Sequence, residues 1–269
     1  MGLILGGMIL IGGVVWEGRH FGWWNGRDDI RLGVLADNDW GVIVISPSRK
    51  MVSKLRVKGE VKVWVPRGYG WYRADKLKKL LELEGKIDGF EEVGFYNFGF
   101  VADQKMVVKN FDDWKKTGVL VTKLGVINGL RLKGMMGSFL DKEEEVDDVK
   151  NFGKIKEQVV RDFVDTAVTE EAVRVSVLNT TEEQGLAGWL GERLVWAGFG
   201  VVNTGTAENR VEKCLLVANK NIKKSKVYRF LEREWGCEER EGEIEDQVEL
   251  YIGKGWTEML NYSSYNNLL

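Results

Sequence analysis

The chain has 269 residues, enough for one large or two smaller domains, and its 44% hydrophobic and 30% charged residues exclude wholesale disorder. A formal net charge of -2 excludes a polycation that coats nucleic acid over its whole surface. Two cysteines and one histidine are too few for a disulfide framework or a structural zinc site, and they leave a catalytic triad only one possible imidazole base.

The N-terminal segment allows two interpretations. Residues 2–16 carry no charge, and as a helix they would extend about 22 Å, less than the roughly 30 Å hydrocarbon core of a bilayer. Length therefore favours a buried strand or helix. The alternative is a membrane anchor, because Trp16, Trp23 and Trp24 stand where an interfacial aromatic belt would lie. His20 is expected to be an interfacial side chain rather than a ligand or base.

Short apolar runs between turn residues predict an antiparallel meander in the first part of the chain. Within the third run, alternation places Leu55 toward the core and Lys54 and Arg56 toward solvent, so we expect a charged outer face. A helix should follow over 75–84, where leucines recur at helical spacing. The four predicted strands are Ile30–Leu35, Trp40–Ile45, Met51–Val57 and Val61–Val65.

The middle of the chain contains fewer sequence signals for helices and strands. Residues 111–114 are typical of the start of a helix. Residues 141–148 form an acidic run without the spacing of a calcium-binding loop, and we interpret the run as a solvated helix start or linker. Apolar residues at helical spacing then predict an amphipathic helix over 154–164, which leads to a domain boundary near Thr169.

The C-terminal part predicts a module of strands and helices in the order β-α-β-β-α-β. This order is typical of a split βαβ arrangement, with two helices on one face of a four-stranded sheet. We therefore predict an α/β (α+β) protein of two domains, in which the N-terminal domain holds a mixed sheet with helices. The strands of the module are expected at 173–178, 200–203, 213–218 and 247–252, and its second helix at 223–235.

Local signals mark the ends of the first helix of this module. Residues 181–184 read Thr-Glu-Glu-Gln, the spacing of a capping box at a helix start. Leucines at 186, 190 and 194 form its buried stripe. Gly198 is expected to end the helix in the left-handed conformation, with Phe199 as the accompanying hydrophobic contact.

The glycines and cysteines of the module lead to two further predictions. Glycines at 185, 188 and 191 cost about 1 kcal/mol each relative to alanine in a helix interior, so we expect the backbone there to pack closely on the sheet. Cys214 lies in an apolar run and Cys237 follows the end of a helix, and we expect two buried free thiols rather than a disulfide.

The segment VRVSVLNTTEEQGLAGWLGERLVWAGFGVVNTG resembles the LytR C-terminal domain. The shared features are a V-x-V-x-V-L-N strand, a Thr-rich turn, a Gly-Leu-Ala helix start and an Ala-Gly-Phe helix end before a valine strand. The likeness continues less densely to QVELYIG. The residues that carry the motif are Val177, Leu178, Asn179, Gly185, Leu186, Ala187, Gly198 and Phe199.

In its family this domain often follows a LytR-CpsA-Psr catalytic domain, and residues 27–83 resemble the start of that domain. The matching stretches are Arg27-Asp28-Asp29, VIVISPSRKMVSKLRV and VPRGYGWYRADKL. The resemblance implies a bacterial enzyme class that is membrane-anchored and faces outward. Its members transfer anionic glycopolymers from polyprenyl-pyrophosphate carriers to peptidoglycan, using arginines on the pyrophosphate and aspartates on magnesium. The resemblance also favours the anchor interpretation of residues 1–26.

The chain departs from the family pattern where catalysis needs it. Residues 56–59 read Arg-Val-Lys-Gly in place of a P-R-D stretch, and no arginine-rich stretch follows. Pyrophosphate chemistry needs several converging cations and a metal carboxylate. We therefore predict a degenerate, non-catalytic relative without a cofactor or metal. The alternative is an active phosphotransferase that uses magnesium with Arg27, Asp28, Asp29 and Arg56.

The stretch from Arg49 to Lys79 holds eleven basic and two acidic residues, a local charge of +9. One interpretation is a solvated sheet face. The functional interpretation is a surface for an anionic cell-wall polymer or for membrane lipid head groups. A regulatory protein that binds nucleic acid through the same surface is a less favoured hypothesis. The binding residues would be Arg49, Lys54, Arg56, Lys58, Lys62, Arg67, Tyr69 and Trp71.

These inferences give one prediction for the whole chain. We expect a cell-envelope protein on the outer face of the membrane, with a binding or scaffolding domain at its C-terminus and a protein partner in addition to the anionic one. The predicted parts are a hydrophobic segment at 1–26, a degenerate LytR-CpsA-Psr-like domain at 27–150, a helical linker at 151–170, a LytR C-terminal-like domain at 171–256 and a tail at 257–269.

Overall fold

The computed structural model describes residues 28–86, 89–124, 126–146, 162–164, 166–245 and 247–262. The hydrophobic segment 1–26, Arg27 and most of the helix predicted over 154–164 therefore lie outside the described residues. Within the described ranges, no helix is both long enough and apolar enough to span a bilayer. The described elements are helices and mixed sheets, which confirms the α/β class.

Contacts divide the chain into two compact units that do not follow chain order. The first unit combines Met1–Arg56 with Ala102–Glu144, and the second combines Val57–Val101 with Glu145–Leu269. Residues 57–101 are thus grouped with the C-terminal module, whereas the resemblance of 27–83 to one domain predicts that most of them belong to the N-terminal domain.

A five-stranded mixed sheet in the order β6-β1-β2-β3-β7 is the centre of the first unit. β1 is antiparallel to β2, with Ile30 opposite Ile45, and parallel to β6. The strands predicted between 30 and 57 are confirmed. The bounds are β1 Ile30–Leu35, β2 Trp40–Ser46, β3 Met51–Val57, β6 Gln104–Val107 and β7 Leu140–Val146.

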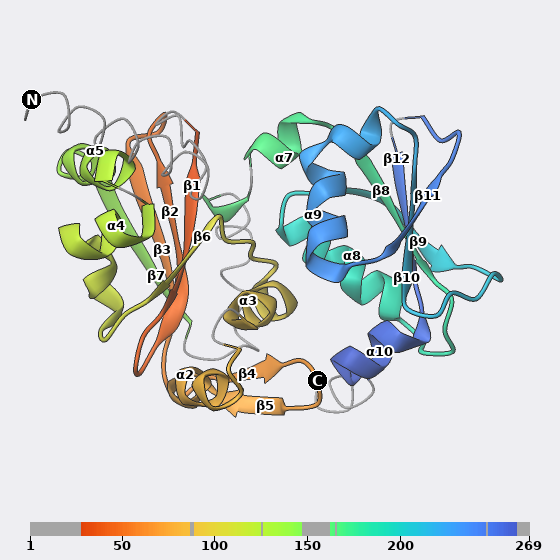
Figure 1. Cartoon of the computed structure of the whole chain (residues 1–269), viewed down its shortest axis with the longest axis horizontal. Helices are drawn as coiled ribbons and strands as arrows, with labels where there is room; N and C mark the ends of the chain where they lie inside the picture. The colour runs from red at the N-terminus through yellow and green to blue at the C-terminus, as the bar shows by residue number, and fades with distance from the viewer. Residues whose placement is uncertain are drawn as a thin grey trace, which may run out of the picture. The chain divides into compact units, whose positions relative to one another are not determined.

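Helices α4 (Thr117–Leu124) and α5 (Val126–Met136) cover one face of this sheet (Figure 1). They follow a 3-10 helix, η2 (Phe111–Lys115), which begins where the sequence predicts a helix. Leu120 and Leu132 pack in one buried cluster with the apolar residues of β1 and β2 on that face. The core of the first unit therefore lies between the sheet and these helices.

The charged outer face predicted from Lys54 and Arg56 is wrong, because Lys54 of β3 is buried, with 5% of its surface exposed, and Arg56 is half-buried. Every residue of β1 and β2 is buried as well. The acidic run after Leu140 is not a helix start or linker but strand β7, which lies beside β3. Carboxylates of β7 accept hydrogen bonds from Lys54, since its Nζ lies 2.7 Å from Asp141 and 3.3 Å from Glu143.

The run at 61–65 does not extend the meander. β4 (Lys62–Val65) pairs with β5 (Gly70–Arg73) as a separate antiparallel hairpin in the second unit. The predicted helix follows as α2 (Ala74–Leu83), and α3 (Phe90–Phe98) comes next. Asn97 of α3 completes the hydrogen bonding of β4, because its side-chain amide accepts from the N–H and donates to the C=O of Trp64, both at 2.8 Å.

The second unit contains another five-stranded sheet, in the order β11-β10-β12-β8-β9. The four predicted strands are confirmed, and β11 is an additional strand parallel to β10. β8 pairs directly and in parallel with both β9 and β12, so the β8–α8–β9 unit is a simple βαβ unit and not a split one. The bounds are β8 Arg174–Asn179, β9 Gly200–Thr206, β10 Cys214–Ala218, β11 Glu238–Glu241 and β12 Gln247–Ile252.

Helices α8 (Leu186–Trp196) and α9 (Lys226–Trp235) lie on one face of this sheet, as predicted (Figure 1). The leucine stripe of α8 is fully buried with Val227 and Leu231 of α9 in the same cluster. The short helices of this unit are α7 Thr166–Glu170, η4 Ile222–Lys224 and α10 Lys254–Leu260. α10 overlaps the segment expected to be a tail, and its Leu260 is part of the core.

Glycine defines both ends of α8. The N–H groups of Gly198 and Phe199 donate back to the last turn in a Schellman motif, which confirms the predicted helix end. At the start, Gly185 is the N-cap with φ at 78°, and no side chain caps the helix. The predicted capping box is wrong because the Thr181 hydroxyl accepts from the N–H of Glu183 within the preceding loop.

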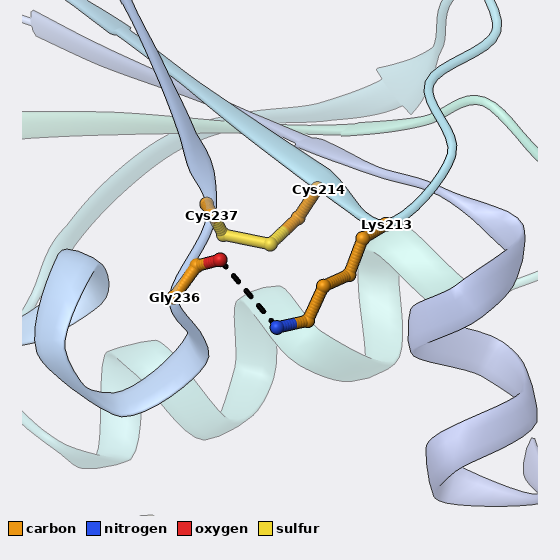
Figure 2. Close-up of a disulfide and its surroundings, with 4 residues drawn as sticks. All are labelled: Lys213, Cys214, Gly236 and Cys237. Atoms are coloured by element: carbon orange, nitrogen blue, oxygen red, sulfur yellow. Dashed lines mark hydrogen bonds between the residues drawn. A yellow bond between two sulfur atoms is a disulfide. The ribbon is translucent and has the colours of Figure 1, made fainter.

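Cys214 and Cys237 form a disulfide (Figure 2), so the expectation of free thiols is wrong. The parallel pairing of β10 and β11 brings the starts of these strands together, with the two Cα atoms 4.8 Å apart. The bond closes a segment that contains all of α9. Beside it, the Nζ of Lys213 donates to the C=O of Gly236 at 3.4 Å.

Helix α3 packs against α8 within the second unit. A Cβ on Gly99, whose φ is 71°, would lie 2.4 Å from the Cβ of Trp196, so this approach requires glycine. The guanidinium of Arg193 lies 4.7 Å from the ring centre of Trp189 and 4.6 Å from that of Trp196. It also donates to the C=O of Tyr96 at 3.3 Å, and these contacts hold α3 on the C-terminal module.

Candidate functional site

The residues of the alternative catalytic site do not converge in the described part of the chain. Asp29 precedes β1, next to Asp28, and accepts a hydrogen bond from Arg49 in the β2–β3 turn at 3.1 Å. Arg56 near the end of β3 instead binds Asp39, which precedes β2, with Nη2 2.6 Å from Oδ2. The seven residues of β2 separate these two ion pairs, a length of about 20 Å in an extended strand.

The basic residues predicted to bind an anionic partner fall in both compact units, and most of them pair with carboxylates. Although burial alone lowers the pKa of the Lys54 ammonium, its hydrogen bond to Asp141 and the negative charges nearby raise that pKa overall. The other pairs are Arg49–Asp29, Arg56–Asp39, Lys58–Glu145 and Arg67–Glu92.

The remaining members of that set include two aromatic residues. Tyr69 and Trp71 are half-buried, and the ring of Trp71 packs edge-on against Trp64 with centroids 5.6 Å apart. Lys62 is exposed. The local charge of +9 is therefore largely compensated by acids from other parts of the chain, and a cationic docking surface stays a prediction.

A pocket of about 790 Å³ lies at one edge of the C-terminal sheet. Three parallel strands end there in register, because Asn179 of β8 stands opposite both Thr206 of β9 and Ile252 of β12. Ligands of open α/β sheets bind outside the carboxyl ends of the strands, and the pocket lies at that edge of β8, β9 and β12. Because β10 is antiparallel to β12, its carboxyl end lies at the opposite edge.

Three segments line the pocket: residues 180–183 after β8, residues 210–212 between β9 and β10, and helix α10 with its C-cap. Asn179 shapes the first segment. Its Oδ1 accepts from the N–H and the hydroxyl of Thr181 at 2.9 and 2.7 Å, and its Nδ2 donates to the C=O of Glu183 at 2.7 Å. The last residue of the V-x-V-x-V-L-N strand therefore fixes the rim of the pocket through an Asx turn.

Thr180 joins the pocket segments to the sheet. Its N–H and hydroxyl both donate to the C=O of Ile252, at 3.0 and 2.8 Å, and its hydroxyl accepts from the N–H of Val211 at 3.3 Å. Thr257 of α10 is likewise buried, with its hydroxyl donating to the C=O of Lys254 at 2.7 Å. Both buried hydroxyls of the lining are thus fixed by hydrogen bonds to the backbone.

The second and third segments are in direct backbone contact. A Cβ on Gly253 would lie 2.2 Å from the carbonyl oxygen of Val211, so this approach requires glycine. The N–H of Gly253 donates to the C=O of Lys213, and the N–H of Gly255 donates to the C=O of Glu212, both at 2.7 Å. These bonds join the 210–212 segment to the start of α10 in the wall of the pocket.

The charged lining of the pocket is acidic overall. Arg210 lies 3.1 Å from Glu182, and Lys254 lies 3.4 Å from Glu258, in pairs exposed to solvent. Exposed pairs of this kind contribute about 0–1 kcal/mol each. The lining also contains Glu183 and Glu212, which leaves four glutamates against two bases. Within the described ranges, no group of three or more His, Cys, Asp or Glu residues is placed to hold a metal ion.

The sequence that forms β8, α8 and the strands next to this pocket matches a known family model. Residues 172–256 match the LytR_C family model. The family is described as the LytR cell envelope-related transcriptional attenuator. The LytR_C match confirms the resemblance found in the motif around Asn179, and it spans the chain from the start of β8 into α10. Most of the pocket lining belongs to the LytR_C region.

A search of curated proteins found none that matches the chain. Among solved structures, B. subtilis TagU is 7% identical, with 51% of this chain and 75% of that chain covered and a TM-score of 0.27. B. subtilis TagT is 11% identical, with 80% and 94% covered and a TM-score of 0.28. No functional inference rests on likeness at these scores.

Sequence reasoning found the motif of the LytR_C region but not its pocket. The motif includes Asn179 and the Thr-rich turn after it, but it does not include Glu212 or Lys254. These residues come from segments far apart in the sequence, and only the register of β8, β9 and β12 brings them together. The Gly-Lys-Gly sequence at 253–255 was the available signal for a close backbone approach after the last strand.

Proposed function

We propose that the chain is a non-catalytic cell-envelope protein whose LytR_C region binds an envelope component in the pocket at the carboxyl edge of its sheet. The observation that carries this proposal is the role of Asn179, because a residue of the LytR_C motif also holds the pocket rim. The description of the family as cell envelope-related supports the location of the component. Binding without catalysis is favoured because Asp29 and Arg56 form ion pairs at opposite ends of β2.

A location on the outer face of the membrane is part of this proposal. The disulfide between Cys214 and Cys237 supports it, because disulfides form and persist in oxidising compartments. The uncharged segment at 2–16 would supply the membrane anchor.

Sedimentation of the full chain with isolated cell walls tests the proposal. We expect the protein to be retained on the walls. A Glu258→Trp variant places a bulky ring in the wall of the pocket, and we expect its retention to fall about tenfold, equivalent to about 1.4 kcal/mol. Glu232→Trp is the matched control, because Glu232 is an exposed glutamate on α9 and not part of the pocket lining.

Two results would contradict the proposal. In one, the unmodified chain is not retained on cell walls. In the other, Glu258→Trp and Glu232→Trp are retained equally, which would place wall binding elsewhere on the molecule.

A further inference from the structure

The acidic lining of the pocket restricts the charge of its ligand. Glu183 belongs to the loop after β8 and Glu212 to the loop between β9 and β10, so two glutamates from different segments line the same pocket. In the described part of the chain, neither carboxylate has an ion-pair partner within 4.0 Å. The two bases of the lining each already have a glutamate partner. An anionic ligand would therefore meet excess negative charge.

Both loops that carry these carboxylates have a fixed backbone. The C=O of Glu183 accepts from Asn179, and the C=O of Glu212 accepts from Gly255, both at 2.7 Å. A pocket with a fixed backbone avoids the ordering of flexible loops that weakens binding. The volume of about 790 Å³ is within the range of small-molecule sites.

We infer that this pocket binds a ligand with primary ammonium groups and rejects phosphate-bearing polymers. The inference rests on the proposed function and specifies the charge of the envelope component. Ammonium groups in a cell wall come from amino sugars without their acetyl groups or from diamino acids in peptides. Both present the same chemistry to Glu183 and Glu212, namely N–H donors with a positive charge for a carboxylate acceptor.

Calorimetric titration of the full chain with matched probes tests the inference. The sugar arm compares a glucosamine tetramer with its N-acetylated form, and the peptide arm compares a lysine tetrapeptide with its acetyl-lysine form. We expect the amine form of at least one pair to bind, and to bind more weakly as ionic strength rises. The arm that binds identifies the source of the ammonium group. Inorganic polyphosphate should give no binding to the pocket.

Variants distinguish the pocket from general charge attraction. The double variant Glu183→Gln and Glu212→Gln should weaken amine binding by about tenfold, because it removes two of the four negative charges of the lining. The control carries Glu232→Gln and Glu243→Gln, the same charge change at exposed positions outside the pocket lining. We expect the control to bind as the unmodified chain does.

The inference is overturned if acetylated probes bind as tightly as amines, if no amine probe binds, or if polyphosphate binds and Glu258→Trp abolishes that binding. Equal weakening by both double variants would also overturn it. The proposed function would still hold after any of these results if the unmodified chain is retained on cell walls and the Glu258→Trp variant is not. Loss of wall retention in the unmodified chain would instead remove the proposed function itself.

Discussion

Lys54 is a buried cation that joins β3 to β7. Its ammonium donates to Asp141 and Glu143, while the rest of its side chain is covered. A buried charge is tolerated when it is paired and hydrogen-bonded, and removing one partner leaves the others without compensation. Because the carboxylates of this cluster are partly exposed, water offsets some of that loss.

Replacing Lys54 tests how much its hydrogen bonds to Asp141 and Glu143 stabilise the fold. Lys54→Met should lower the free energy of unfolding by about 1–3 kcal/mol at pH 7, because Asp141 and Glu143 lose their hydrogen-bond donor. Urea denaturation measures this change. Lys62→Met, at an exposed position of β4, is the control and should change stability by less than about 0.5 kcal/mol.

The same variant has a defined pH dependence. The pKa of Lys54 in the folded chain is raised above its usual value of 10.5. The cation therefore stabilises the fold fully below pH 10.5, and this contribution is lost as pH rises through the folded pKa. The stability difference between the unmodified chain and Lys54→Met should shrink above pH 10.5. A difference that stays constant through that range would contradict the assignment.

At the scale of elements, close packing of α8 on β9 depends on one of its glycines. A Cβ on Gly191 would lie 2.7 Å from the Cγ2 of Thr204, whereas a Cβ on Gly188 would meet nothing within 4 Å. The expectation of close backbone packing is therefore confirmed at 191 and wrong at 188. At Gly185 the requirement is a positive φ of 78°.

Gly188 and Gly191 give a matched pair of variants. Gly188→Ala should stabilise the chain by about 0.5–1 kcal/mol through helix propensity. Gly191→Ala should destabilise it by about 1 kcal/mol, because the cost of overpacking exceeds the same gain in propensity. Thermal unfolding measures both. The packing account would be contradicted if both variants raised the unfolding temperature.

The disulfide should stabilise the element that it closes. Cys214 and Cys237 are 23 residues apart, and a loop of this length contributes about 3 kcal/mol in the chain-entropy description. The double variant Cys214→Ser and Cys237→Ser should therefore unfold at a lower urea concentration. The unmodified chain in reducing agent should show the same loss, and stability that is unaffected by reduction would show that the bond contributes nothing.

The elements that the sequence predicts are those with strong hydrophobic periodicity. β1 to β3, β8, β10, α8 and α9 follow from alternation or a leucine stripe. β7 and β11 were missed because their sequences, LDKEEEV and EERE, are charged and are stabilised as edge strands by pairing with β3 and β10. The pocket and the disulfide could not be predicted, since both depend on which strands are neighbours.

At the scale of the whole molecule, two compact units share the chain, and residues 57–101 are grouped with the C-terminal module. The chain leaves the first unit after β3, builds β4, β5, α2 and α3 in the second unit, and then returns to form β6. The LytR_C region therefore has α3 packed on it through Gly99 and Arg193. The LytR_C match at 172–256 therefore covers only part of the second unit, which also contains residues 57–101.

Hydrogen exchange of the full chain, with and without solubilised cell-wall fragments, tests whether the LytR_C pocket is the binding site. We expect slower exchange in the three segments that line the pocket, at 180–183, 210–212 and 254–261, when fragments are present. The same segments in Glu258→Trp should show no change. Protection confined to the basic stretch at 49–58, or no protection in the described residues at all, would show that this pocket does not bind the cell wall.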